Sequence, residues 1–558
     1  LNRSNFKEKN TSGMFVSTVP FKIDIDSNLN FIDFLGKVSL MQTSIFRHQK
    51  YPYLKLLHDI KKKYDISENL YDFVLSYQNA RDNKYTSSID YKTTWEPISH
   101  IAESIEAHFY DMDGNNGANI LYDYQIEKFS DKDIQCLHKR ICHMAEQALQ
   151  NVKLKDISIL CDDDEKIINE FNDTDFDYDK NESLVNIFGK VVKANANKTA
   201  YIFKGQTLTY KELDEKSNIL ANYLISKGIT KNDVIGIMFN RSLNIPISMW
   251  GVLKTGASYM LIDPSLPQDR INYMLTNANA KYVLTNLYIN YDSINIDNIL
   301  LKEEQNFKNT LNENSSKNLS NSEYENNTKN KDNKCVLPKV ESSNEDRFCI
   351  NYTSGSTGTP KGVELKRIGI INLLNGYKKQ IGSHECNTFL SSATVAFDIF
   401  IVENFVSILD GKTVVFADDD EQKIPAFTSK LIKDYNVDFL LATPSKLDLL
   451  LTETDCLKNV KIIQVGGEVL KNTFYKKLRK ATNAKIYNSY GPSECTVCAS
   501  NNLVTENDLS IGYPFTNTKI YIMNSKNDIL PINTRGEIVI KGDGVGIGYL
   551  NKYDFNGI

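Results

Sequence analysis

The spacing of apolar residues predicts an amphipathic helix over residues 131–151. Its apolar positions recur at near-helical spacing, and Asp131 is placed to cap the N-terminus. These positions are Ile134, Leu137, Ile141, Met144 and Leu149. We expect this helix to close a first domain that covers residues 1–160.

An acidic stretch without clear periodicity follows the helix. Residues 161–182 begin with "CDDDEKIINEFNDTDFDYDK", a composition typical of a linker. A second domain is therefore expected to begin at Ser183 and to extend to residue 558.

Helical and strand patterns alternate in the second domain. A helical pattern over residues 210–228 is followed by short apolar runs that suit buried strands, and this alternation indicates an α/β fold with parallel sheets. The strand candidates are residues 233–239, 281–286, 413–418, 437–443 and 460–466. Near the C-terminus, residues 518–524 and 536–542 resemble strands with no helix between them, which indicates a small β-rich subdomain.

One segment of the second domain is too polar to pack. Residues 303–334 carry few large apolar groups, so burial cannot offset the entropy lost on ordering them. We expect a disordered surface insertion that extends to about residue 345.

The overall composition is that of an ordinary globular protein. Hydrophobic residues make up 41% and charged residues 24% of the 558 residues, and the net charge is -5. This charge gives no general attraction to nucleic acid, and we expect none as a partner. No apolar run approaches the roughly 18 residues of a membrane span, and the N-terminus lacks the apolar core of a signal peptide. A cytoplasmic protein without a membrane partner is expected.

Nine cysteines are scattered along the chain, which is typical of reduced thiols. Two clusters invite a metal interpretation, but neither has a second ligand pair at a suitable spacing, so we expect no zinc site. The clusters are Cys136, His138, Cys142 and His143, and Cys495 with Cys498.

The strongest chemical signal is the loop "YTSGSTGTPKG" at residues 352–362. Its glycines allow backbone N–H groups to approach a ligand, and its hydroxyls and Lys361 can bind phosphate. A flexible turn is the alternative, but it would need neither the lysine nor so many hydroxyls. The loop is not a P-loop, because Pro360 and Gly362 break that pattern.

This loop resembles the signature of the adenylate-forming enzymes, especially the amino-acid-activating domains of nonribosomal peptide synthetases. Five further segments resemble motifs of that family, in the same order along the chain. They are residues 208–224, 253–271, 397–400 ("FDIF"), 488–494 ("NSYGPSE") and 536–550 ("GEIVIKGDGVGIGYL").

Residues 13–23 and 48–57 are similar to late motifs of a condensation domain, and residues 171–174 ("FNDT") resemble the usual joint between the two domains. The resemblance implies the C-terminal lobe of a condensation domain, of acetyltransferase-like fold. An adenylation core of two parallel α/β subdomains and a small β-rich subdomain would follow.

The resemblance also implies a reaction. ATP and an amino acid would give an aminoacyl adenylate and pyrophosphate, and the acyl group would pass to the phosphopantetheine thiol of a peptidyl carrier domain. Catalysis would rest on aligning the substrate carboxylate and on stabilising the charge of the leaving group. ATP, Mg²⁺ and other synthetase domains are the expected cofactors and partners.

The family's nucleotide site maps onto the glycine loop and residues 488–494. By resemblance, Lys361 and Thr353 would act on the leaving pyrophosphate and Glu494 would bind Mg²⁺. Tyr490 would pack on adenine, Asn488 would lie beside its edge, and Ser493, where the family usually has Thr, would reach the α-phosphate. The full expected set is Thr353, Ser354, Gly355, Ser356, Thr357, Gly358, Lys361, Asn488, Ser489, Tyr490, Gly491, Ser493 and Glu494.

Asp398 matches the carboxylate that binds the substrate's α-amino group, although a helix cap is the alternative role. The remaining pocket positions carry no charge, so the resemblance implies a substrate with an uncharged, mostly apolar side chain. Gln464 could still orient an amide or a hydroxyl. The other expected pocket residues are Ile399, Val402, Leu441, Gly466, Ser489, Val497 and Cys498.

Several family features are missing. No HHxxxDG motif is present, the chain begins at Leu1, and no hinge, C-terminal lysine motif or carrier serine follows residue 550. We therefore expect a piece of a longer protein that adenylates poorly when isolated. Phe400 and Ile547 also replace the family's usual serine and arginine. An acyl- or aryl-CoA ligase of the same superfamily and a non-catalytic relic are the alternatives.

Overall fold

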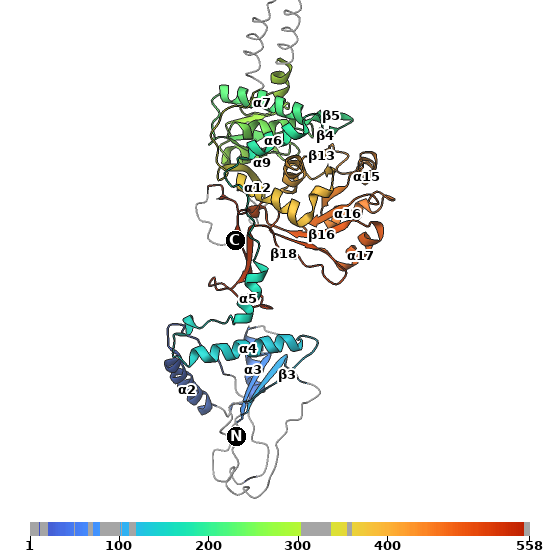
Figure 1. Cartoon of the computed structure of the whole chain (residues 1–558). Helices are drawn as coiled ribbons and strands as arrows, with labels where there is room; N and C mark the ends of the chain where they lie inside the picture. The colour runs from blue at the N-terminus through green and yellow to red at the C-terminus, as the bar shows by residue number, and fades with distance from the viewer. Residues whose placement is uncertain are drawn as a thin grey trace, which may run out of the picture. The chain divides into compact units, whose positions relative to one another are not determined.

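The computed structural model describes residue 11 and residues 21–48, 51–64, 71–78, 101, 103–110, 119–302, 336–353 and 360–551 (Figure 1). The chain forms two compact units. The first comprises residues 1–167 and 526–536, and the second comprises residues 168–525 and 537–558.

The first unit is built on a three-stranded sheet of order β1-β2-β3, in which β1 is parallel and β3 antiparallel to β2. Helix α4 packs on β3, where the Tyr122 hydroxyl lies 3.1 Å from His138 Nδ1. Its elements are α2 (Phe31–Arg47), α3 (Tyr53–Tyr64), β1 (Phe73–Gln78), β2 (Ile105–Tyr110), β3 (Asn119–Tyr124), α4 (Asp131–Ala148) and η1 (Leu154–Asp156).

Helix α4 confirms the predicted helix but corrects its cap. The N-cap is Ser130, whose hydroxyl accepts from the Asp133 amide while the Asp133 carboxylate accepts from the Ser130 amide. Asp131 is the first helical residue, one position beyond the cap. This reciprocal capping box satisfies two backbone donors, which a single aspartate at the next position could not do.

The expected irregular linker contains a helix, α5 (Asp162–Phe171). Four acidic residues occupy its first turn, where they interact favourably with the helix dipole. Asp164 is also buried, and its carboxylate accepts two hydrogen bonds from the Arg140 guanidinium at 2.8 and 2.6 Å. The acidic composition that suggested a linker therefore stabilises a helix start.

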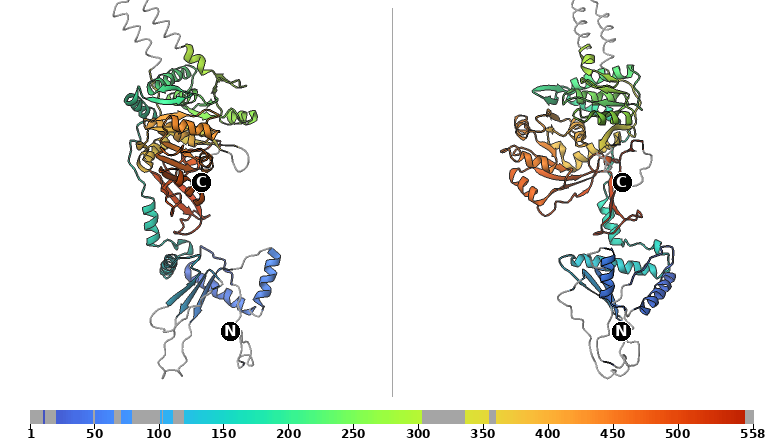
Figure 2. Two further views of the ribbon diagram at one scale, coloured as in Figure 1. Left: turned by 90° about the vertical axis from the view of Figure 1, so that its right-hand side faces the viewer. Right: turned by 180° about the vertical axis from the view of Figure 1, so that it is seen from behind.

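The second unit contains two large sheets that are mostly parallel in their centres, as the alternating pattern predicts (Figures 1 and 2). The seven-stranded sheet has the order β21-β11-β10-β7-β6-β8-β9. Its strands are β6 (Val234–Ile237), β7 (Ser258–Leu261), β8 (Tyr282–Leu284), β9 (Ser293–Ile294), β10 (Arg347–Thr353), β11 (Lys361–Lys366) and β21 (Gly548–Tyr549).

The nine-stranded sheet has the order β18-β17-β16-β15-β14-β12-β13-β4-β5. All of the predicted strands in the two sheets are present. The second sheet comprises β4 (Thr199–Phe203), β5 (Gln206–Thr209), β12 (Thr388–Ser391), β13 (Thr413–Phe416), β14 (Phe439–Ala442), β15 (Ile462–Gly466), β16 (Lys485–Tyr490), β17 (Ser500–Leu503) and β18 (Tyr513–Pro514).

Helices cover both sheets, and one continuous apolar core joins them. This core includes Ile235 of β6, Phe389 of β12 and Trp250 of α8. The helices are α6 (Leu184–Asn195), α7 (Tyr210–Ser226), α8 (Asn244–Lys254), α9 (Gln268–Asn277), α12 (Arg367–Gly376), η3 (Tyr377–Ile381), η4 (Ser383–Glu385), α13 (Ile399–Ile401), η5 (Val402–Val406), α14 (Ser407–Leu409), α15 (Pro425–Asp434), α16 (Pro444–Leu450), α17 (Asn472–Ala481) and η6 (Ser493–Cys495).

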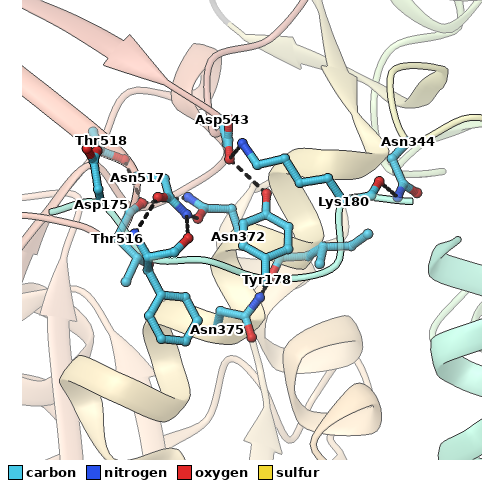
Figure 3. Close-up of polar contacts among 12 residues, drawn as sticks. Asp175, Tyr178, Lys180, Asn344, Asn372, Asn375, Thr516, Asn517, Thr518 and Asp543 are labelled. Atoms are coloured by element: carbon cyan, nitrogen blue, oxygen red, sulfur yellow. Dashed lines mark hydrogen bonds and ion pairs between the residues drawn. The ribbon is translucent and has the colours of Figure 1, made fainter. Parts of the chain in front are cut away.

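The predicted β-rich element is the antiparallel hairpin of β19 (Thr518–Met523) and β20 (Glu537–Gly542). Residues 172–182, which we call the strap, run beside its base. Asn517 accepts from the Phe176 amide and donates to the Phe176 carbonyl and to Asn372 Oδ1, at 2.8, 3.0 and 3.0 Å. Figure 3 shows Tyr178 and Lys180 converging on Asp543, each at 2.8 Å. The strap is thus bonded along its length to other parts of the second unit.

Most of the expected disordered insertion, residues 303–335, lies outside the described residues. The next strand, β10, begins at Arg347, after the expected end of the insertion. Residues 336–346, between them, are largely irregular.

Candidate active site

The glycine loop connects two adjacent antiparallel strands. Thr353 at the end of β10 pairs with Lys361 at the start of β11. Residues Ser354, Gly355, Ser356, Thr357 and Gly358, predicted to bind phosphate, lie outside the described residues. The hairpin nevertheless fixes the two ends of the loop, and Lys361 stands at its exit.

Tyr549, which the sequence did not single out, contacts both Lys361 and Glu494. Tyr549 of β21 pairs with Val363 of β11, and its hydroxyl donates to Glu494 Oε1. The Lys361 ammonium lies 5.3 Å from the centre of the Tyr549 ring. Burial and the Glu494 carboxylate raise the pKa of Tyr549 to about 12, so this phenol keeps its proton. The only sequence signal for this role was the position of Tyr549 in the last family-like segment.

The Glu494 carboxylate fits a magnesium ion held largely by substrate. It is partly buried and lies in η6 directly after Ser493. In the described part of the chain, no group of three or more His, Cys, Asp or Glu side chains is arranged to hold a metal. A single carboxylate suits Mg²⁺, which usually keeps several waters and binds phosphate oxygens as well.

Asp398 stands one residue before α13, at the edge of the same region. Its Oδ2 accepts from the Ser493 hydroxyl at 2.6 Å. Although Asp398 is at the N-cap position, its side chain makes no capping hydrogen bond. Burial raises the pKa of this carboxyl, while the Ser493 hydroxyl opposes the increase by stabilising the ionised form.

A cavity of about 50 Å³ opens beside Asp398. Apart from Asp398, its walls are uncharged. They are formed by Phe397, Ile399, Leu441, Gln464, Gly466, Gly467, Ser489, Gly491 and Val497. The structure thus brings together most of the predicted substrate-binding residues, from four separate segments of the chain.

Two predicted pocket residues take other places. Val402 and Cys498 are buried, but neither is among the residues that line this cavity. The Cys498 thiol donates instead to the Ser500 carbonyl at 3.4 Å, and burial raises its pKa to about 12. Each belongs to the apolar core that joins the two sheets.

The turn that follows β16 has unusual backbone geometry. Thr496 and Val497 both have positive φ, at 52° and 73°, a conformation that β-branched residues rarely adopt. Gly491 is required beside them, because a Cβ there would lie 2.3 Å from the Val497 carbonyl oxygen. Such strain persists where surrounding contacts enforce it, and here it places Val497 in the cavity wall.

The amide of Asn488 is committed to the protein. It donates to the Leu509 and Ser510 carbonyls at 2.8 and 3.2 Å. Tyr490, two residues further along β16, is partly buried and packs beside Cys495. Contact of either residue with adenine stays a prediction.

A buried ionic cluster braces the segment that leads to Asp398. The Arg241 guanidinium donates to the carbonyls of Ser391 and Ala393 at 2.7 and 2.6 Å. The Glu403 carboxylate accepts from the Ser392 and Ala393 amides at 3.2 and 3.1 Å, and Lys446 donates to the Ser392 hydroxyl. Desolvation lowers the pKa of Arg241 to about 10, which leaves it charged near neutral pH. Sequence analysis missed this cluster because its members are far apart in the chain.

Two family profiles cover nearly the whole sequence. Residues 188–550 match the profile of the AMP-binding enzymes, and residues 1–168 match that of the condensation domain. The chain belongs to the AMP-binding enzymes. Its combination of condensation and AMP-binding domains identifies it with the nonribosomal peptide synthetases, as the colinear segments suggested.

Known synthetases align along the full chain. Gramicidin S synthase 2 of Brevibacillus brevis is 30% identical over 564 residues, which is 99% of this chain and 12% of that protein. Bacitracin synthase 3 of Bacillus licheniformis is 29% identical over 97% of this chain and 8% of its own length. The chain therefore spans about an eighth or less of these two relatives.

Solved structures show the same fold. The AMPPNP-bound form of the synthetase FmoA3 matches with a TM-score of 0.79 at 18% identity, over 94% of this chain and 55% of that one. A four-domain synthetase bound to AMP and glycine matches with a TM-score of 0.74 at 21% identity, over 99% of this chain and 41% of that one. The α/β fold with an N-terminal condensation lobe is thereby confirmed.

Within the described ranges, no helix has the length and apolar character needed to cross a membrane.

Proposed function

We propose that this AMP-binding synthetase chain activates an amino acid with ATP. One observation carries the proposal: a chain of contacts runs from Lys361 through Tyr549, Glu494 and Ser493 to Asp398 at the uncharged cavity. It connects the residues expected at the leaving phosphates with the carboxylate expected at the substrate ammonium.

The chemistry follows from these positions. The substrate ammonium would pair with Asp398, which directs its carboxylate toward the α-phosphate beside Ser493. A carboxylate oxygen attacks the α-phosphorus, the bond to the bridging oxygen breaks, and pyrophosphate leaves with the electron pair. Lys361 would offset charge on the departing group, and Glu494 would hold Mg²⁺, which, when bound, neutralises phosphate charge.

The product would be an aminoacyl adenylate. We propose that the phosphopantetheine thiol of a peptidyl carrier domain then attacks its acyl carbon, forming a thioester and releasing AMP. In this scheme residues 1–160 are a condensation lobe, 161–182 the linker and 183–558 the adenylation core of a cytoplasmic synthetase.

The substrate side chain should be uncharged and mostly apolar. A charged side chain would enter a cavity whose only ionised group, Asp398, pairs with the α-ammonium, so its desolvation would go uncompensated.

Amino-acid-dependent exchange of pyrophosphate into ATP, measured with the full-length protein that includes residues 1–558, tests this proposal. Each of the twenty amino acids is supplied with Mg²⁺-ATP, and benzoate and octanoate are included as acids that lack an amino group. We expect the strongest exchange with an apolar amino acid. Strongest exchange with Lys, Arg, Asp or Glu would contradict the pocket assignment, and exchange with benzoate or octanoate alone would favour a CoA ligase.

A further inference from the structure

Two of the polar residues that line the cavity are held by a buried hydrogen-bonded chain, which we call the pocket relay. The Tyr377 hydroxyl donates to Gln464 Oε1 at 2.7 Å, and Gln464 Nε2 donates to Ser489 Oγ at 2.7 Å. Ser489 Oγ in turn donates to Asn501 Oδ1 at 2.7 Å. The relay thus comes from four elements: η3, β15, β16 and β17.

The relay is shielded from water. Tyr377 is 0%, Gln464 1% and Asn501 8% exposed. In such surroundings a polar group without a partner costs about 1–3 kcal/mol, so these side chains strongly favour the paired arrangement.

All donors in the relay point in one direction. A hydroxyl has a single proton, and both hydroxyl protons of the relay are already donated to protein acceptors. The amide oxygen of Gln464 likewise has a protein donor. The relay thus leaves a polar substrate side chain only the second Gln464 Nε2 proton and the second lone pairs of Gln464 Oε1 and Ser489 Oγ, whereas an apolar side chain needs no partner at all.

The cavity also limits size. One water needs about 10–15 Å³, so about 50 Å³ holds roughly three to five non-hydrogen atoms of about that size. This corresponds to the side chain of a valine or a leucine.

We propose that Tyr377 and Asn501 are specificity-determining positioning residues. By holding the two ends of the pocket relay, they make the cavity select a small apolar amino acid over a polar one of equal shape. This inference rests on the proposed function, because it takes the cavity beside Asp398 as the amino-acid site.

Two isosteric pairs of amino acids test the relay. L-threonine has a hydroxyl where L-valine has a methyl group, and L-leucine and L-asparagine have side chains of similar shape. Their dissociation constants are measured by calorimetry for the wild-type protein and for the Tyr377→Phe and Asn501→Leu variants. We expect the wild type to bind the apolar member of at least one pair at least tenfold more tightly.

Each variant should move the preference toward the polar member by about tenfold. Tyr377→Phe leaves the Gln464 oxygen without its donor, so a substrate hydroxyl or amide can supply one. Asn501→Leu leaves the Ser489 proton without its acceptor, so a polar substrate can accept it. One unpaired buried group corresponds to a change of this size. Since the two substitutions act at opposite ends, either variant is sufficient if the other fails to fold.

Tyr210→Phe is the matched control. Tyr210 is also fully buried, and its hydroxyl oxygen lies 2.6 Å from the Lys412 carbonyl and 3.2 Å from the Ile408 carbonyl, outside the cavity lining. It should lower stability without changing either ratio. Unchanged ratios in Tyr377→Phe and Asn501→Leu would overturn the inference, and so would a wild type that binds none of the four amino acids. Exchange driven by another amino acid would still support the proposed function in either case.

Discussion

Burial and the Ser493 hydroxyl shift the pKa of the Asp398 carboxyl in opposite directions. Burial favours the protonated form and raises its pKa above the ordinary value of 3.8, while the Ser493 hydroxyl stabilises the ionised form. The substrate ammonium would require the ionised form. Amino-acid binding should therefore depend on pH through this single residue.

We predict that amino-acid affinity falls with decreasing pH, starting at a higher pH than an ordinary aspartate would allow. Ser493→Ala removes the bond to the ionised carboxylate, so the fall should begin at a still higher pH, whereas Ser493→Thr should behave as the wild type. Asp398→Asn should bind about 100-fold more weakly, because the ammonium loses its buried partner, and should show no such dependence. Calorimetry across the acidic range measures all four proteins. A wild-type profile that matches that of Asp398→Asn would contradict the prediction.

Tyr549 is expected to position the Glu494 carboxylate. Tyr549→Phe removes the hydrogen bond but keeps the ring beside Lys361, so it should weaken Mg²⁺-dependent ATP binding by roughly fivefold to tenfold. Titration of Mg²⁺ at fixed ATP, followed by calorimetry, gives the affinity. Tyr521→Phe, on the β19 hairpin, is the control and should change nothing. Equal Mg²⁺ dependence in Tyr549→Phe and the wild type would exclude a positioning role.

At the scale of elements, the strap shows how an irregular segment can be fixed without secondary structure. Asn172 exchanges two hydrogen bonds with the Ile520 backbone, and Asn517 makes three with Phe176 and Asn372. Backbone groups that lack a sheet partner are thus satisfied by asparagine side chains. Asn517 also has a φ of 50°, a left-handed conformation that asparagine tolerates better than most residues.

Asn517→Ala should destabilise the second unit by about 2–3 kcal/mol. The substitution removes the bonds of Asn517 to the Phe176 amide and carbonyl and to Asn372 Oδ1. It also places alanine, which tolerates positive φ less well than asparagine, at a φ of 50°. Denaturation by urea, followed by tryptophan fluorescence, measures the change, since Trp250 lies in the core of this unit. Asn279→Ala is the matched control, because Asn279 lies in the same unit and has a φ of 47° but is exposed. Equal losses for the two variants would show that the strap contacts contribute nothing.

Periodicity predicted the elements that have a regular pattern of apolar residues. The largely apolar runs that became β14 and β15 are buried on both faces, as is usual for parallel strands, and α4 has one apolar face. The β10–β11 hairpin was not predicted, because its connection is a long glycine-rich loop rather than a short turn. Helix α5 was not predicted either, because its acidic residues suggested a solvated linker and no local pattern reveals that Asp164 pairs with the distant Arg140.

At the scale of the whole molecule, the chain divides into two compact units. Asp164 belongs to the first unit, where it binds Arg140 and accepts from the Ile532 amide of the returning segment 526–536. Glu494, Asp398 and the cavity belong to the second unit. The stability of one unit should therefore change without altering the site of the other.

Asp164→Ala should lower the stability of the first unit by about 3 kcal/mol, because it leaves the Arg140 guanidinium largely buried without its anion. ATP affinity should stay within twofold of the wild type. Scanning calorimetry resolves the transitions of the two units, and calorimetric titration gives the affinity. Asp163→Ala is the control, since its ion pair with Lys139 is exposed and should contribute less than about 1 kcal/mol. A large loss of ATP affinity in Asp164→Ala would show that the units are coupled.

The sequence by itself determined the family and the order of the domains, and it singled out the charged groups that we propose for the site, Lys361, Asp398 and Glu494. These features are carried by short contiguous segments, within which neighbouring residues must act together. Only the tertiary structure decided which side chains support these groups and the cavity. Tyr549, Arg241 and Tyr377 lie far along the chain from the residues they contact, so no local pattern reveals them. The same reason places Val402 and Cys498 in the core instead of the cavity wall, because burial depends on how separate segments pack.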